Sequence, residues 1–181
     1  GAGINAGGLI GLSFNNCDIK DATVTIRNGR IASERTTENE TPASYGAHAG
    51  GIAGRLEHTS SMTNCHVYGD NLIIEAISNE IMNYVGGLVG DMFNTFHRDI
   101  IPVQNCSVTG VNGTKLRLTL SQIANAHNDN YLGGIGGRIF YKVVGAKVDG
   151  VEIVASGINS TNDSYIGELI AFFNAQSLAG N

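Results

Sequence analysis

The chain has 181 residues, of which 25 are glycine and only 15% are charged. A hydrophobic content of 42% excludes wholesale disorder, and a net charge of −5 argues against a nucleic-acid-binding surface. No apolar run approaches the roughly 18 residues that a membrane-spanning helix requires, so we expect no membrane span in this segment. The chain opens with no Met and no signal peptide, which indicates a mature or excised piece.

A glycine pair followed by a short apolar run recurs along the chain. It is complete in four copies and degraded in a fifth, where Glu168 replaces the second glycine; the copies lie at residues 6–11, 49–54, 85–90, 132–137 and 166–171. The spacing between copies is unequal, so a search at one fixed period would miss the repeat. Self-similarity of this kind is typical of repeat architectures.

Two further blocks follow each full copy, always in the same order. The second block reads Asn-Cys-x-Ile/Val at residues 16–19, 64–67 and 105–108, with a weak version at 145–148. The third is an alternating strand pattern at residues 23–26, 72–75, 116–120 and 151–154. All blocks are of strand length and pattern, and the segments between them are rich in turn-forming residues. Length variation falls in those segments, above all in 27–47 and 91–104, which we expect to be loops.

A unit of three short strands cannot close its own core, but stacked units can bury one continuous core. We therefore expect an all-β, right-handed parallel β-helix of about four and a half coils, each with three short strands. It forms a single domain over residues 1–181, with coils starting near residues 6, 49, 85, 132 and 166. A β-sandwich of the same strands is the competing fold, although it does not explain the constant block order.

The three cysteines, Cys17, Cys65 and Cys106, occupy one repeat position. We expect free, buried thiols stacked inside the coils, because parallel Cβ directions suit disulfide geometry poorly. A Cys₃ metal site is the alternative, but three ligands in a line do not form a tetrahedron. We expect no metal site and no cofactor.

The residue after each of these cysteines should point outward, in a column of Asp18, His66, Ser107 and Lys147. The first three are the residue types of a catalytic triad, but no oxyanion hole or cleft is evident beside them. The acids Glu34, Glu38 and Glu40 lie in a segment typical of solvated loops. Acidic residues in the Asn-rich segments around Asp129 and Asp163 do not have the spacing of a calcium loop. We therefore expect no catalytic residues.

An aromatic column is the best candidate for a binding site. Tyr84, Tyr131 and Tyr165 each lie two residues before the first glycine of their copy, and His48 holds the same place in the second copy. If the residues next to the glycines face the core, these four side chains face outward and could stack against a sugar. The alternative is a structural ladder in which the rings stack on one another.

The combination of Gly-Gly-Leu-Val-Gly at residues 86–90 with Asn-Cys-Ser-Val-Thr-Gly at 105–110 resembles the GLUG-motif repeats. Such repeats occur in secreted and surface proteins of bacteria, some of them adhesin-like. The resemblance implies a secreted or cell-surface location and carries over no catalytic residue. We expect a non-enzymatic adhesive module or rigid spacer, with a carbohydrate-active β-helix enzyme as the alternative. The implied partners are a glycan or a host or cell-surface protein, and open strand edges indicate edge-to-edge self-association.

Overall fold

The computed structural model describes residues 4–35, 46–78, 82–93, 101–120, 129–140, 142–157 and 164–174. Regular structure in these ranges is all β, arranged in four parallel sheets. The first sheet contains β1 (Ile4–Gly7), β5 (Ala47–Gly50), β9 (Met82–Gly86), β14 (Asp129–Gly133) and β19 (Ser164–Gly167). The second contains β2 (Ile10–Ser13), β6 (Ala53–Glu57), β10 (Val89–Phe93), β15 (Gly136–Phe140) and β20 (Ile170–Asn174).

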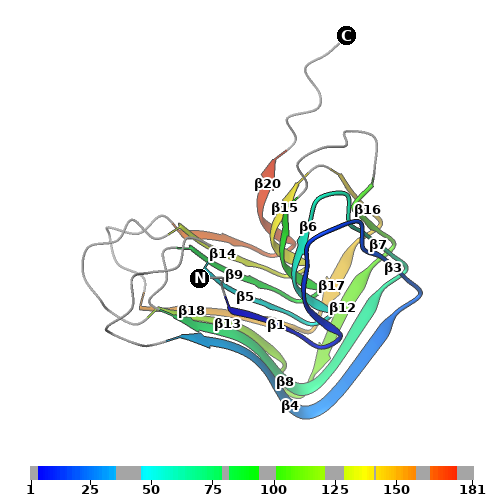
Figure 1. Ribbon diagram of the computed structural model, residues 1–181. Helices are drawn as coiled ribbons and strands as arrows, with labels where there is room; N and C mark the ends of the chain where they lie inside the picture. Colours follow the sequence, from blue (N-terminus) through cyan, green and yellow to red (C-terminus); the bar gives the residue numbers. More distant parts are fainter. Residues whose placement is uncertain are drawn as a thin grey trace.

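The third and fourth sheets complete each turn of the chain. The third contains β3 (Asp18–Lys20), β7 (Ser61–Thr63), β11 (Val103–Gln104) and β16 (Val143–Val144). The fourth contains the long strands β4 (Thr23–Arg35) and β8 (His66–Ser78), and then two pairs of shorter strands: β12 (Ser107–Val111) with β13 (Lys115–Leu120), and β17 (Lys147–Asp149) with β18 (Glu152–Ser156). In Figure 1 the second sheet turns away from the first, and β4 and β8 bend around the outside.

The register confirms the glycine repeat. Ala6 pairs with Ala49, and the same column continues through Val85, Leu132 and Ile166. The first two glycine blocks pair in parallel, β1 with β5 and β2 with β6. One strand from each successive turn therefore enters each sheet, an arrangement that fits a parallel β-helix.

The glycine block was expected as one strand but forms two, joined by a bend at its second glycine. A Cβ added at this second glycine would lie 2.0 to 2.3 Å from a carbonyl oxygen of the following coil, in all four complete copies. No side chain fits at that distance, so the coils approach closely at this corner only because glycine is there. The bend separates the first sheet from the second.

In the first coil, the predicted position of the second block is wrong. Asp18 pairs with Ser61 in β7, and Thr23 pairs with His66 in β8. The strand equivalent to Asn-Cys-His-Val therefore begins at Asp21-Ala22, five residues later than the Asn-Cys match suggested. The cause is packing, because this register places Val24 beside Val67 in the core.

The expected loop at 27–47 begins later than predicted. β4 continues to Arg35, and Ile31 pairs with Ile74. The third block of the first coil is thus residues 30–35 rather than 23–26. In the other expected loop, β10 extends to Phe93 and β11 covers Val103–Gln104, while residues 36–45 and 94–100 lie outside the described residues.

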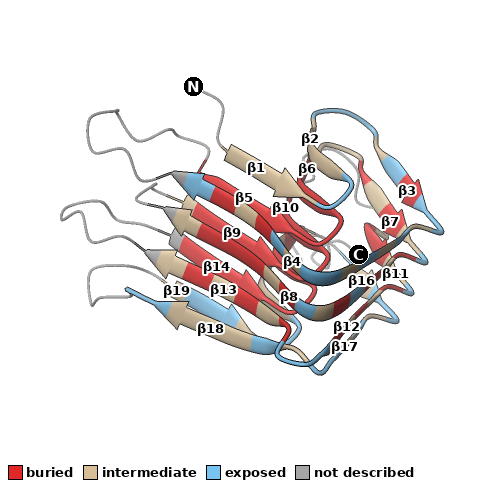
Figure 2. Ribbon diagram, turned by 90° about the horizontal axis from the view of Figure 1, so that it is seen from below, coloured by how far each residue is buried: buried red, intermediate tan, exposed pale blue. Residues whose placement is uncertain are grey.

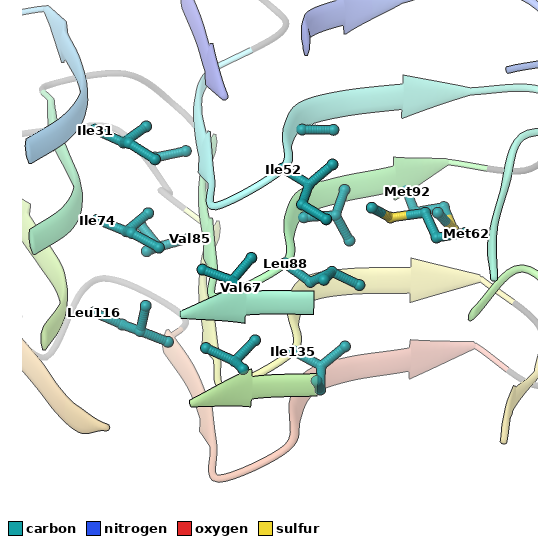
Figure 3. Close-up of a cluster of buried hydrophobic side chains, with 14 of the residues drawn as sticks. Ile31, Ile52, Met62, Val67, Ile74, Val85, Leu88, Met92, Leu116 and Ile135 are labelled. Carbon is teal, nitrogen blue, oxygen red and sulfur yellow. The ribbon is translucent and has the colours of Figure 1, made fainter. Parts of the chain in front are cut away.

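The core consists of columns of aliphatic side chains that continue from coil to coil. Ile52, Leu88 and Ile135 form one such column, and each is fully buried (Figure 3). The same position in the first and last coils holds Leu9, which is 59% exposed, and Leu169, which is 39% exposed. Burial is therefore greatest in the middle of the stack and falls at both ends, as Figure 2 shows for the strands.

The three cysteines are free, as expected. Cys65 and Cys106 are buried neighbours, and the backbone N–H of Cys65 donates to Cys106 Sγ at 3.4 Å. Cys17 does not share their column, because the first-coil register places Ala22 there. Cys17 is instead half-buried, and its backbone N–H donates to Ser60 Oγ. The predicted stack of three thiols is therefore a stack of two.

Candidate functional site

The four residues predicted to bind a ligand form one continuous stack on the first sheet. His48 and Tyr84 lie with ring centroids 4.8 Å apart and planes 8° from parallel. Tyr84 and Tyr131 are 4.9 Å apart at 2°, and Tyr131 and Tyr165 are 5.1 Å apart at 5°. These distances match the spacing of neighbouring strands. Pairing in register therefore produces the stack, which we call the aromatic ladder.

Most of the aromatic ladder is inaccessible. His48 is fully buried, Tyr84 is 1% exposed and Tyr131 is 6% exposed, whereas Tyr165 at the end of the stack is 40% exposed. The residues next to them in sequence, such as Ala49 and Val85, belong to the core, so the ladder lies on the opposite face of the sheet as expected. That face is covered rather than open to solvent. The three buried members therefore have the surroundings of a structural ladder.

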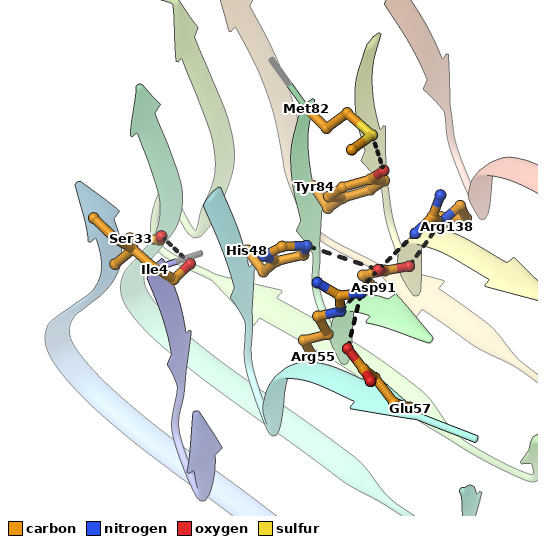
Figure 4. Close-up of polar contacts among 9 residues, drawn as sticks. All are labelled: Ile4, Ser33, His48, Arg55, Glu57, Met82, Tyr84, Asp91 and Arg138. Carbon is orange, nitrogen blue, oxygen red and sulfur yellow. Dashed lines mark hydrogen bonds and ion pairs between the residues drawn. The ribbon is translucent and has the colours of Figure 1, made fainter. Parts of the chain in front are cut away.

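Charged side chains from the second sheet pack against the ladder (Figure 4). Arg138 donates from Nε and Nη2 to the two carboxylate oxygens of Asp91, both at 2.8 Å. Its guanidinium carbon also lies 4.5 Å from the centre of the Tyr84 ring. Arg55 approaches Asp91 at 3.5 Å and Glu57 at 2.8 Å. We call these four residues, Arg55, Glu57, Asp91 and Arg138, the ionic cluster.

The charges of the ionic cluster balance, with two carboxylates and two guanidiniums. Asp91 is fully buried and Arg55 is 9% exposed, so each charge depends on its partners rather than on water. Three of the four lie in successive coils at one register position, in the order Arg55, Asp91, Arg138. Positive and negative side chains thus alternate along this column, and their attraction holds neighbouring coils together.

Burial also shifts the pKa values of the ladder. Desolvation lowers the pKa of His48 to about 3, with the positive charges of Arg55 and Arg138 acting in the same direction and Asp91 opposing them. Desolvation raises the pKa of Tyr84, and the charge of Asp91 adds to the effect. His48 is therefore neutral at pH 7, and its 3.7 Å approach to Asp91 is a polar contact rather than an ion pair. Neither group is placed to exchange protons with a substrate.

The predicted outward polar column is partly correct. His66, Ser107 and Lys147 are neighbours in the fourth sheet, but Thr23 takes the place expected for Asp18. His66 Nδ1 lies 2.8 Å from Ser107 Oγ, and His66 Nε2 lies 3.0 Å from Asn64 Oδ1. Asn64 Nδ2 donates to Asp21, which leaves its oxygen to accept from His66 Nε2–H.

This hydrogen-bond chain orients Ser107 toward a basic imidazole nitrogen. Acyl transfer also requires donors aimed at the developing oxyanion. The neighbouring backbone groups are occupied by strand pairing, in which the N–H of Ser107 donates to Cys65 O and the N–H of Lys147 donates to Cys106 O. The arrangement therefore serves as a polar link between coils.

A second ionic ladder on the fourth sheet was not predicted. The carboxylate of Glu75 is 3% exposed and contacts Arg30 Nε on one side and Arg117 Nη1, at 3.5 Å, on the other. Glu34, assigned to a solvated loop, lies on β4 and pairs with Arg30 at 3.3 Å. Arg117 pairs with Glu75 in register, whereas the first-coil partner of Glu75 is Ala32 and Arg30 reaches the carboxylate from two residues earlier in β4, so no repeat position in the sequence indicated this group. Glu38, Glu40 and Asp163 lie outside the described residues.

Among the described residues, no group of three or more His, Cys, Asp or Glu side chains could hold a metal ion. The same part of the chain contains no helix that is long and apolar enough to cross a membrane.

Comparison with known proteins agrees with the resemblance noted in the sequence. The family described as "the GLUG motif" matches residues 2–28, which contain β1, β2 and β3 and end within β4. Halomucin of Haloquadratum walsbyi is 31% identical over 106 residues, which is 59% of this chain and 1% of that protein. No solved structure gives a significant match. The chain thus carries a GLUG motif in its first coil and is similar to a short portion of Halomucin.

Proposed function

We propose that this chain is a non-enzymatic, rigid spacer module of a secreted or surface-exposed protein. Its fold would be a right-handed parallel β-helix of about four and a half coils. The observation that carries the proposal is the use of side chains on both faces of the first sheet to join coils. One face supplies the buried aliphatic columns, and the other supplies the aromatic ladder and the ionic cluster.

Stiffness is the property that this arrangement favours. Each coil contacts mainly its neighbours, so resistance to bending depends on the contacts between successive coils. Aromatic stacking at about 4.9 Å and a buried, bidentate Arg–Asp pair both restrict relative movement of coils. The likeness to a protein named Halomucin and the GLUG motif support a surface-associated setting.

Adhesion is the second candidate, and the exposed ring of Tyr165 favours it. Tyr165 is the one described member of the aromatic ladder with substantial exposure, at 40%. A glycan or a surface protein could stack on that ring. The sequence predicted that all four aromatic residues bind a ligand. In this proposal only Tyr165 contacts the ligand, and the stacked rings of Tyr131, Tyr84 and His48 hold it in place. Edge-to-edge self-association stays a prediction, to be checked by sedimentation velocity.

A glycan array on the purified chain, followed by a polysaccharide-cleavage assay, tests these proposals. If the chain is a spacer, no glycan should bind with a dissociation constant below about millimolar. No polysaccharide should release reducing ends when it is incubated with the chain. Binding that Tyr165→Ala removes without lowering the melting temperature would favour adhesion. Tyr84→Ala is the matched control, because its ring is 1% exposed and its loss should lower stability instead. Release of reducing ends from any polysaccharide would overturn the non-enzymatic proposal.

A further inference from the structure

The corner within the fourth sheet carries one residue more in the third coil than in the second. This corner is the point at which β4 and β8 bend (Figure 1). Three residues, 112–114, separate Val111 and Lys115 in the third coil. Their partners in the second coil, Asp70 and Ile73, are separated by only two residues. The extra residue of the third coil therefore bulges out of the sheet.

The tip of this bulge consists of Asn112 and Gly113, and it projects into solvent. Both residues are exposed, and both have positive φ, 50° and 85°, as the central residues of a type I′ turn do. A Cβ built on Gly113 would meet no atom within 4 Å. The fourth coil crosses this corner with two residues, 150–151, where the third uses five, 110–114, so it has no equivalent turn to cover the tip.

Thr114 fixes the base of the turn. Its backbone N–H and its hydroxyl both donate to the carbonyl oxygen of Val111, at 3.2 and 2.9 Å. The hydroxyl oxygen also accepts from the backbone N–H of Leu72 at 3.4 Å, and Thr114 is 2% exposed. The turn is thus held at its base, and its two exposed residues are the part with room to change conformation.

The side chain of Asn112 joins the turn to the second coil. Its Nδ2 donates to Asp70 Oδ1 at 2.9 Å, in a contact that is exposed to solvent. A hydrogen bond in this position contributes little to stability, because water replaces it when it breaks. The side-chain amide can therefore swing back toward the backbone nitrogen of Gly113, with which it can close a five-membered ring.

We propose that Asn112 is a site of spontaneous deamidation. The Gly113 nitrogen attacks Cγ of Asn112, the bond from Cγ to Nδ2 breaks, and the Gly113 N–H proton leaves with Nδ2 as ammonia. Water then opens the cyclic imide at either carbonyl, which gives aspartate or isoaspartate at position 112. Glycine favours the attack because no side chain shields its nitrogen and its backbone dihedrals are free. This inference does not depend on the spacer or adhesion proposal.

Deamidation would change the contact between the second and third coils. A carboxylate at position 112 would face the carboxylate of Asp70, where an amide donor now lies 2.9 Å from it. Like charges opposite one another on neighbouring strands are destabilising. Isoaspartate would also add one carbon to the backbone of the turn. The modification therefore converts a link between these two coils into a repulsion.

The other Asn-Gly pair of the chain is a matched control. Asn28 and Gly29 occupy the same corner in the first coil, but they lie inside β4 rather than in a bulge. A Cβ built on Gly29 would lie 2.2 Å from Ile26 Cγ2, and Asn28 Oδ1 accepts from Asn71 Nδ2 at 3.0 Å. The same ring therefore has less room to form in β4 than in the turn.

Peptide mapping by mass spectrometry tests the proposal on the full chain. The folded protein is incubated in mildly alkaline buffer beside two free peptides, residues 24–34 and 107–118, which give the rate that each local sequence has without the fold. Position 112 of the protein should react at no less than about one fifth of the rate of its peptide, and position 28 at least about tenfold more slowly than its own. Aspartate and isoaspartate should both appear at position 112.

Three results would overturn the proposal. Equal protection of positions 28 and 112 would show that deamidation requires unfolding of the whole chain. Retention of Asn112 while its free peptide is consumed would show that the turn does not allow the ring to close. Aspartate without any isoaspartate would indicate direct hydrolysis of the amide, without the cyclic imide.

A pair of variants tests the consequence for stability. Asn112→Asp should lower the melting temperature by about 1 to 3 °C, because it places two carboxylates in contact. Adding Asp70→Asn to the same chain should recover most of that loss. An equal loss with and without Asp70→Asn would overturn the inferred repulsion between the second and third coils.

Discussion

Three coils have leucine at the same repeat position, and these three side chains differ widely in burial. The same substitution at each of them therefore tests how the stacked core contributes to stability. Leu88 lies in the middle of the column and is fully buried, while Leu9 and Leu169 lie at its ends and are 59% and 39% exposed. The change to Ala removes the same atoms at each site. Differences in the free energy of unfolding therefore report the position in the stack.

The expected magnitudes follow from burial. Leu88→Ala removes a fully buried side chain and leaves a cavity, so it should cost about 3 to 5 kcal/mol. With only about two fifths of its surface buried, Leu9→Ala should lose about two fifths of the roughly 2 kcal/mol that burial of a Leu side chain contributes, or about 0.8 kcal/mol. Leu169→Ala, about three fifths buried, should cost about 1.2 kcal/mol on the same basis. Solvent can fill the space at either end, so no cavity cost is added there.

Urea denaturation followed by circular dichroism measures these differences. The dependence on urea concentration must be compared between variants, because the ends of a repeat stack can unfold before its centre. Val111→Ala on the exposed face serves as a control and should change stability by less than about 0.5 kcal/mol. Equal costs for Leu9→Ala and Leu88→Ala would refute the argument that one column runs through all the coils.

Three further predictions concern the ionic cluster, the aromatic ladder and the thiols. Asp91→Asn removes the fully buried carboxylate that pairs with Arg138 and one of the two carboxylates that contact Arg55, and it should cost about 3 kcal/mol or more in urea denaturation, whereas Glu34→Gln, in an exposed pair, should cost under about 0.5 kcal/mol; equal costs would contradict the structural role of the cluster. The folded pKa of His48, about 3, lies below its ordinary value of 6.5, so the stability that its burial carries is complete above pH 6.5 and is lost as the pH falls toward 3. His48→Tyr should therefore flatten the fall in melting temperature between pH 6.5 and 4.5, and an unchanged slope would count against neutral burial. Ellman's reagent should find three thiols in unfolded, non-reduced protein and only one fast-reacting thiol, Cys17, in native protein; a single thiol after unfolding would indicate a disulfide.

The sequence by itself determined the repeat at the glycine corner. The coils approach one another there too closely for any side chain, so the chemistry of one residue type reports the tertiary contact directly. For the same reason the alignment of Ala6 with Ala49 and Val85 was predicted correctly, as was the sharing of one column by His48, Tyr84, Tyr131 and Tyr165. A fixed offset from the glycines is sufficient to place such residues.

The register of the first coil was decided by the tertiary structure. Two segments, Asn16–Ile19 and Asp21–Val24, fit the pattern of a polar turn followed by an alternating strand, and the cysteine favoured the first. Side-chain packing selects the second, because Val24 then joins Val67 and Ile31 joins Ile74. A five-residue shift in one coil changes no local propensity, and only the fit against the neighbouring coil distinguishes the two registers.

The burial of the aromatic ladder also depended on the tertiary structure. Sequence spacing shows that the rings lie on the face opposite the core, but not that another sheet covers that face. The bend at the glycines brings Asp91 and Arg138 of the second sheet against Tyr84 and His48. The angle between two sheets arises from the packing of the whole coil, so a column that spacing alone assigned to solvent became part of the interior, with only Tyr165 left substantially exposed.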